Sequence, residues 1–140
     1  MTHPILKKKL AQLKEYLDKL APYVALSSDV LLHNEEKRVA MERWFQLAVD
    51  EAIDINTALI YQGGGAIPES YKSTFHDLAE LGIITHNFAE QIAESAKVRN
   101  RIIHDYEKMQ YSDMIESIKK FFEMYIVYMQ ILIKKFVNKK

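Results

Sequence analysis

The sequence predicts an all-α fold, a bundle of about five helices without a sheet. Apolar residues recur at spacings of three and four over long stretches, as they do on one face of a helix. Glycine and proline are sparse, with 4 and 3 residues among 140, which favours long helices. No segment alternates polar and apolar residues over a useful length, as a half-buried strand would. We expect residues 1–140 to form a single domain, because this is a usual domain size.

Long apolar stripes mark the first two helices. In the first, leucines recur at four-three spacing, and Pro22 lies just past them and helps to end the helix. The second opens near Ser27 to Asp29, which are good capping residues, and runs to about Gln62, where Gly63 to Gly65 stop it. The first stripe consists of Leu6, Leu10, Leu13, Leu17 and Leu20, and the second of Met41, Phe45, Ala48, Ala52, Ile55 and Leu59.

Two shorter helices follow the glycines. Pro68 suits the first turn of a third helix that runs through about Leu81, and Gly82 suits its end. Thr85 can cap a fourth helix that reaches about Val98.

The last helix spans roughly Ser112 to Val137 and is apolar on more than one face. Phe121, Tyr128 and Ile131 lie beside its main stripe. So wide an apolar surface fits a central, well-buried helix, and it equally fits a helix that also serves a dimer or partner interface. We expect this helix to pack roughly antiparallel to the long second helix. Its main stripe consists of Ile115, Ile118, Phe122, Tyr125, Met129, Leu132 and Phe136.

Composition restricts the classes of function. Basic and acidic residues balance at 19 each, so any RNA contact must come from a local patch and not from net charge. The lack of cysteine removes disulfides, thiol catalysis and thiolate metal sites. The N-terminus does not have the pattern of a signal peptide, and the longest apolar run, Phe121 to Ile133, is shorter than the roughly 20 residues of a membrane span. We therefore expect a cytoplasmic protein that has no membrane partner.

The reactive side chains lie between the fourth and fifth helices, in the run Arg99 to Tyr106, RNRIIHDY. His104 is suited to shuttle a proton near neutral pH, and Arg99 can bind phosphate through a bidentate fork. RNA carries its own nucleophile, the 2′-hydroxyl, so these two side chains suit a ribonuclease that needs no metal. Asn100 can bind the phosphate or orient His104. The alternative is a helix end with a solvated charge cluster.

Helix geometry adds a condition to this hypothesis. On a regular helix Arg99 and His104 would be about 140° apart, so they share a face only if the helix breaks or distorts. We therefore expect a kinked or looped segment here. Two acids of the second helix, Glu51 and Asp54, could pair with Arg99 or Arg101 and fix the motif, or they could be solvated surface carboxylates.

Arg99, His104 and Tyr106 form the pattern R-x4-H-x-Y, which resembles the motif of HEPN-family toxins of the HepT group. The surroundings are similar as well. Residues 52–56 (AIDIN) close a long second helix as in that family, and residues 64–71 and 78–84 (LAELGII) resemble its next segment. The resemblance covers most of the chain from about Met41 onward.

The resemblance implies a HEPN-type helical bundle with a metal-independent ribonuclease activity. It implies a homodimer in which two motifs face each other, with RNA as the substrate. It also implies an antitoxin partner, an MntA-like nucleotidyltransferase, which transfers AMP onto Tyr106. Adenylate there would place bulk and negative charge two residues from His104 and would block RNA phosphate. Because its neighbours in sequence are polar, we expect the Tyr106 hydroxyl to be accessible.

Three hypotheses follow. The first is a toxin endoribonuclease whose catalytic residues are Arg99 and His104, with Asn100, Arg101, Asp54 and Glu51 in support. The second is a non-catalytic HEPN module that partners a minimal nucleotidyltransferase, and the third is a purely structural helical dimer. None of them requires a cofactor or metal, and His33, His76 and His86 lack the spacing of a zinc site.

Overall fold

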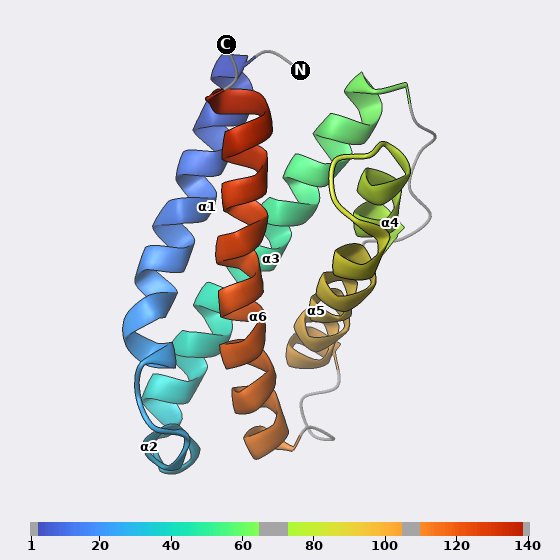
Figure 1. Cartoon of the computed structure of the whole chain (residues 1–140). Coiled ribbons are helices and arrows are strands. Elements are labelled where there is room, and N and C mark those ends of the chain that lie inside the picture. The colour runs from blue at the N-terminus through green and yellow to red at the C-terminus, as the bar shows by residue number, and fades with distance from the viewer. Residues whose placement is uncertain (1–2, 65–72, 105–109, 139–140) are drawn as a thin grey trace.

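The structure, a computed structural model, describes residues 3–64, 73–104 and 110–138. Over these ranges it is helical and contains no strand, which confirms the predicted fold class (Figure 1). The described residues form six α-helices in the order α1 (His3–Val24), α2 (Ser28–His33), α3 (Glu35–Gln62), α4 (Ser73–Glu80), α5 (His86–His104) and α6 (Tyr111–Leu132), and α6 continues as the π-helical turn η2 (Ile133–Val137).

The long helices α3 and α6 run in the same direction, so the predicted antiparallel arrangement is wrong (Figure 1). Contacts advance together along both helices. Phe45 packs against Phe121 with ring centroids 6.4 Å apart, and further along Asn56 accepts a hydrogen bond from Tyr128. The reason is α4, which has 8 residues and is too short to traverse the bundle. Only α5 carries the chain back before α6 begins (Figure 1).

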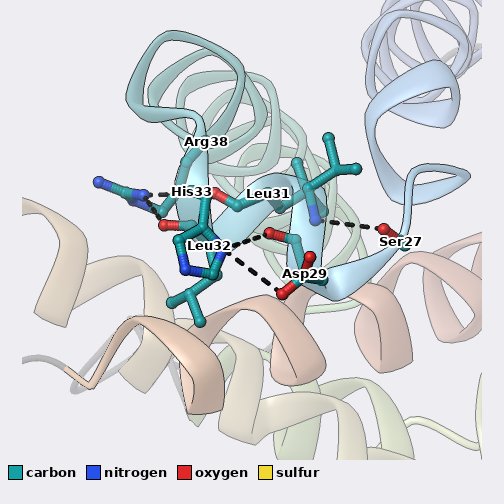
Figure 2. A network of polar contacts seen from close by, with 7 residues as sticks. Ser27, Asp29, Leu31, Leu32, His33 and Arg38 are labelled. Atoms are coloured by element: carbon teal, nitrogen blue, oxygen red, sulfur yellow. Dashed lines mark hydrogen bonds and ion pairs between the residues drawn. The ribbon is translucent and has the colours of Figure 1, made fainter.

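The second predicted helix is two helices, because the chain breaks at Asn34, whose backbone is extended (φ −128°, ψ 96°). Its Oδ1 accepts a hydrogen bond from the backbone N–H of Lys37 at 3.0 Å and so caps α3. The end of α2 is capped by Arg38, whose Nη1 donates to the carbonyl oxygens of Leu31 at 3.3 Å and Leu32 at 2.9 Å (Figure 2). These side chains satisfy the backbone groups that the break exposes.

Two helices end later than expected. α1 continues past Pro22 to Val24. A proline this close to the end of a helix removes only one backbone donor, so it does not stop the last turn. α5 continues past Val98 as far as His104, which places Arg99 inside a helix and not after one.

The stripes predicted for the first two helices lie in the core, whereas Phe122, Met129 and Phe136 of the stripe predicted for the last helix are only half-buried. Every residue in the stripes of the first two predicted helices is at most 6% exposed. On α6, Phe121 and Tyr128 are buried in the chain's own core, as expected for a central helix, whereas Ile131 is half-buried. No helix in the described ranges combines the length and the apolar character that a membrane crossing needs.

A buried cluster of rings and hydroxyls joins four helices. The ring of Phe75 on α4 lies edge-on to Tyr125 and Tyr128 of α6, with centroids 6.4 and 6.0 Å apart. The Tyr128 hydroxyl donates to Asn56 Oδ1 on α3 at 2.6 Å, and the Tyr125 hydroxyl lies 2.6 Å from Ser95 Oγ on α5. Burial raises the pKa of both phenols, so they remain protonated and available as hydrogen-bond donors. The cluster thereby fixes the positions of α3 and α5 relative to α6.

A buried charge pair lies near the beginning of α3. Arg38 is 6% exposed and Glu42 is 3% exposed, with Nε and Oε2 separated by 3.9 Å. Within the described part of the chain neither of these two atoms has a hydrogen-bond partner. The Arg38 guanidinium also lies 4.0 Å from the ring centroid of Tyr111, the first residue of α6. Burial raises the pKa of Glu42 to about 7, although the charge of Arg38 opposes this.

This pKa predicts a pH dependence of folding stability. Because the pKa of Glu42 is higher in the folded chain than its usual 4.5, the folded state binds more protons between pH 4.5 and about 7. Stability should therefore fall as pH rises through this window, by an amount on the order of 3 kcal/mol, and stay level above it. Denaturant unfolding of the wild type and of Glu42→Gln, at pH 5 and pH 8, measures the difference. The wild type should lose stability over this interval relative to Glu42→Gln, and equal changes in both would contradict the assignment.

Candidate ribonuclease site

The motif lies on the second half of α5, a helix with a well-defined start and one buried face. Thr85 Oγ1 accepts a hydrogen bond from the backbone N–H of Phe88 at 3.1 Å, which confirms the predicted cap. The helix then buries a stripe and exposes the opposite side. The buried residues are Ala89, Ile92, Ala93, Ser95, Ala96 and Val98.

The helix does not break between Arg99 and His104, so our expectation of a kink between them is wrong. Five regular helical steps separate the two residues by about 140° around the axis and by about 7.5 Å along it. The packing of α5 against α3 and α6 explains why the helix stays regular this far. Within one copy of the chain Arg99 and His104 therefore stand on different sides of α5.

Arg99 is directed toward α3. Its side chain is only 15% exposed, and its Nε donates a hydrogen bond to Asp50 Oδ1 at 2.7 Å. Its Nη1 donates to Asn100 Oδ1 at 3.1 Å. In this structure the Asn100 amide oxygen therefore contacts the arginine. A cation held in place at the edge of the core is suited to bind a phosphate oxygen.

His104 is the last residue of α5, and it is exposed. Asn100 and Arg101 are exposed as well, while Ile102 is half-buried and Ile103 is 38% exposed. An exposed imidazole at a helix end is accessible to a substrate and can exchange a proton with it. Tyr106, the expected modification site, lies outside the described residues.

The two acids expected to support the motif have other surroundings. Asp54 forms an ion pair with Lys9 of α1. Glu51 is half-buried, and burial together with the charge of Asp54 raises its pKa. The structure places Asp50 against Arg99, an acid that the sequence did not single out. A signal was available, because Asp50 lies next to Val49 and three residues before Ile53, both buried, and so stands at the edge of the core face of α3.

His33, His76 and His86 lie on different helices, away from one another in the sequence. His33 lies at the end of α2, with Nδ1 3.4 Å from Asp29 Oδ1 (Figure 2), and His86 lies 4.0 Å from Glu80. His76 is half-buried on α4. Among the described residues no three histidine, aspartate or glutamate side chains gather in a way that could hold a metal ion.

Comparison with known sequences finds one matching family and a curated relative that covers most of the chain. The sequence profile of the family described as Ribonuclease HepT-like matches residues 13–132, which include the whole motif. The tRNA nuclease HepT of Aphanizomenon flos-aquae (strain 2012/KM1/D3) is 29% identical over 126 residues, which are 90% of this chain and 86% of that protein.

Solved structures share the fold. A tri-AMPylated Shewanella oneidensis HEPN toxin in complex with an MNT antitoxin superposes with a TM-score of 0.84 at 18% identity, over 94% of this chain and 98% of that one. A chain of a toxin–antitoxin complex with AMP-PNP has a TM-score of 0.84 at 17% identity, over 94% and 99%. At these identities the likeness concerns the arrangement of the helices.

Proposed function

Because the chain belongs to the Ribonuclease HepT-like family, we propose that it is the ribonuclease toxin of a toxin–antitoxin pair, with Arg99 and His104 as its catalytic residues. We place it in the cytoplasm, as one domain that needs neither metal nor cofactor. The observation that carries this proposal is the family match across the whole motif. In addition, Arg99 is held at the edge of the core by Asp50, on the same helix whose last residue is the exposed His104.

The proposed chemistry uses the substrate's own nucleophile. The 2′-oxygen of RNA attacks the neighbouring phosphorus and loses its proton, while the 5′-oxygen leaves and gains one. The His104 imidazole can accept the first proton or supply the second. Arg99 stabilises the negative charge that grows on the phosphate oxygens. Arg101, which is exposed two residues further along α5, is placed to bind a neighbouring phosphate.

A homodimer would complete this site. Within one chain Arg99 and His104 diverge by about 140°. Two copies related by a twofold axis through the motif would bring both pairs to one cleft and supply two histidines, one as acid and one as base. We expect sedimentation at micromolar concentration to give a dimer, and a monomer with full ribonuclease activity would contradict this arrangement.

The same divergence favours a second candidate function. A chain that does not bring its motif residues together by itself is also suited to a non-catalytic role, as the binding partner of a minimal nucleotidyltransferase. Growth arrest on expression of the chain alone, relieved by His104→Ala, separates the two candidates, because only a ribonuclease depends on that imidazole.

The catalytic assignment predicts large losses of activity. His104→Ala and Arg99→Ala should each reduce RNA cleavage by about 10²–10⁴-fold, because each removes a proton shuttle or a phosphate cation. His33→Ala is the matched control, an exposed histidine at the end of another helix, and it should cleave at the wild-type rate. Cleavage should persist in EDTA. Cleavage that requires a metal and survives both substitutions would refute the site.

We further propose that an MntA-like nucleotidyltransferase neutralises the toxin by transferring AMP from ATP onto Tyr106. Tyr106→Phe should retain most RNA cleavage and escape neutralisation, because the hydroxyl that accepts AMP is gone while Arg99 and His104 remain. Intact-mass measurement after incubation with the cognate enzyme and ATP tests this. Tyr111→Phe is the control and should still gain AMP, since Tyr111 is half-buried with Arg38 against its ring. Adenylate that persists on Tyr106→Phe and disappears from Tyr111→Phe would reverse the assignment.

A further inference from the structure

Arg99 forms an ion pair with Asp50, a residue to which the proposed reaction assigns no role. It joins residues 49 positions apart, on α3 and α5, with Oδ1 2.7 Å from Nε. The side chain of Arg99 is 15% exposed and that of Asp50 is 36% exposed, so the pair lies at the boundary between core and surface. A charge-assisted hydrogen bond of this length, partly shielded from water, has a well-defined geometry.

The atoms involved define the orientation of the guanidinium. Nε is the atom through which the planar group is attached, so a hydrogen bond from its N–H fixes the rotation of the plane. The second contact, from Nη1 to Asn100 Oδ1 at 3.1 Å, fixes the same plane at another of its nitrogens. Asn100 belongs to the same helix as Arg99, whereas Asp50 belongs to a different one. The contact with Asp50 therefore ties the arginine to the rest of the bundle.

We propose that Asp50 is a positioning residue for RNA cleavage: it holds the Arg99 guanidinium, before RNA binds, in the orientation in which it meets the reacting phosphate. This inference rests on the proposed function of Arg99. A cation that is already oriented accelerates a reaction because nothing has to reorganise when charge develops on the phosphate. Asp50 acts through Arg99 and does not touch the RNA, since a carboxylate would repel the phosphate.

A different role for Asp50 would give the opposite result. If the carboxylate only neutralised Arg99, it would compete with the RNA phosphate for the same cation. Its removal would then strengthen RNA binding and would not lower the rate of the chemical step. The sign of the change therefore separates positioning from competition.

The test compares Asp50→Ala, Asp50→Asn and Asp18→Ala with the wild type. Asp50→Ala removes the acceptor, while Asp50→Asn keeps an oxygen that can accept from Arg99 Nε. Asp18→Ala is the control, because it removes an aspartate from a helical ion pair with Lys14 on α1 (2.8 Å). We expect Asp50→Ala to lower kcat by about 10–100-fold with KM changed less than about threefold. Asp50→Asn should recover most of this loss, and Asp18→Ala should match the wild type.

Some kinetic outcomes would overturn the proposal. An unchanged or higher kcat in a folded Asp50→Ala would do so, as would a lower KM without loss of kcat. Circular dichroism and the melting temperature establish that each variant is folded. If Asp50→Ala does not fold, Asp50→Asn and Asp50→Glu keep the test decisive. A rate in Asp50→Glu equal to that of the wild type, despite its longer arm, would show that the position of the carboxylate does not matter.

A second measurement does not depend on activity. In the ¹⁵N-labelled chain, the Nε–H signal of Arg99, assigned by its loss in Arg99→Lys, should be sharp and protected from solvent exchange. It should broaden or exchange rapidly in Asp50→Ala and persist in Asp18→Ala. A signal that stays sharp in Asp50→Ala would overturn the positioning role even if the wild type cleaves no RNA. If the wild type cleaves no RNA and the Arg99 Nε–H signal still broadens in Asp50→Ala, the proposed function is refuted, but the role of Asp50 in orienting Arg99 is retained.

Discussion

The geometry of the candidate site depends on α3, the helix against which each of the other five described α-helices packs. Its buried face is continuous from Met41 to Ile60 and holds α1, α4, α5 and α6 at defined positions around it. The position of Arg99 depends on how α5 packs, and α5 packs against α3 as well as against α4 and α6. Asp50, on α3, is the point at which this packing reaches the motif directly.

Two polar contacts of α3 stabilise neighbouring helices by different means. Asn56 is fully buried and bonds to neutral partners, Thr74 on α4 and Tyr128 on α6. Loss of either partner would leave a buried amide unsatisfied, which typically costs about 1–3 kcal/mol. Asp50 is half-buried and bonds to a cation. The first contact therefore specifies how the bundle packs, and the second orients the side chain that we propose to bind the substrate.

The burial of the long helices can be predicted from the sequence because their apolar residues repeat at helical spacing. The leucines of α1 and the stripe of α3 repeat with the period of a helix, and burial follows from that period. The break between α2 and α3 and the relative direction of α3 and α6 cannot be predicted in this way, because a single residue decides the first and the chain topology decides the second. Asn34 divides one expected helix in two by capping, and the relative direction of α3 and α6 depends on how many helices cross the bundle between them. A periodic pattern contains neither fact.

The candidate site shows the same division. Arg99 and His104 were found from a spaced motif, and that motif falls within the family match. Asp50 is not among the acids that the sequence suggests as partners of Arg99, which are Glu51 and Asp54 on the same stretch of helix. The structure shows that Asp54 belongs to the side of α3 that faces α1 and Lys9, while Asp50 faces α5. Asp50 and Asp54 are one turn apart on α3 and only about 40° apart around its axis, so spacing alone does not show which of the two lies against Arg99.

The Asp50–Arg99 pair should matter more for the orientation of the Arg99 guanidinium than for the free energy of folding. Ion pairs near the surface typically contribute about 0–1 kcal/mol to folding, because water and mobile ions screen them and two long side chains lose freedom. Against a core in which some thirty apolar residues are buried, removing such a pair should hardly change whether the chain folds. The same contact can still govern a reaction, since misplacing a catalytic group by about 1 Å can lower a rate by about 100-fold, which corresponds to nearly 3 kcal/mol in the barrier. An interaction of small value to the fold can thus have a large effect at a site where the transition state tolerates only one position of the cation.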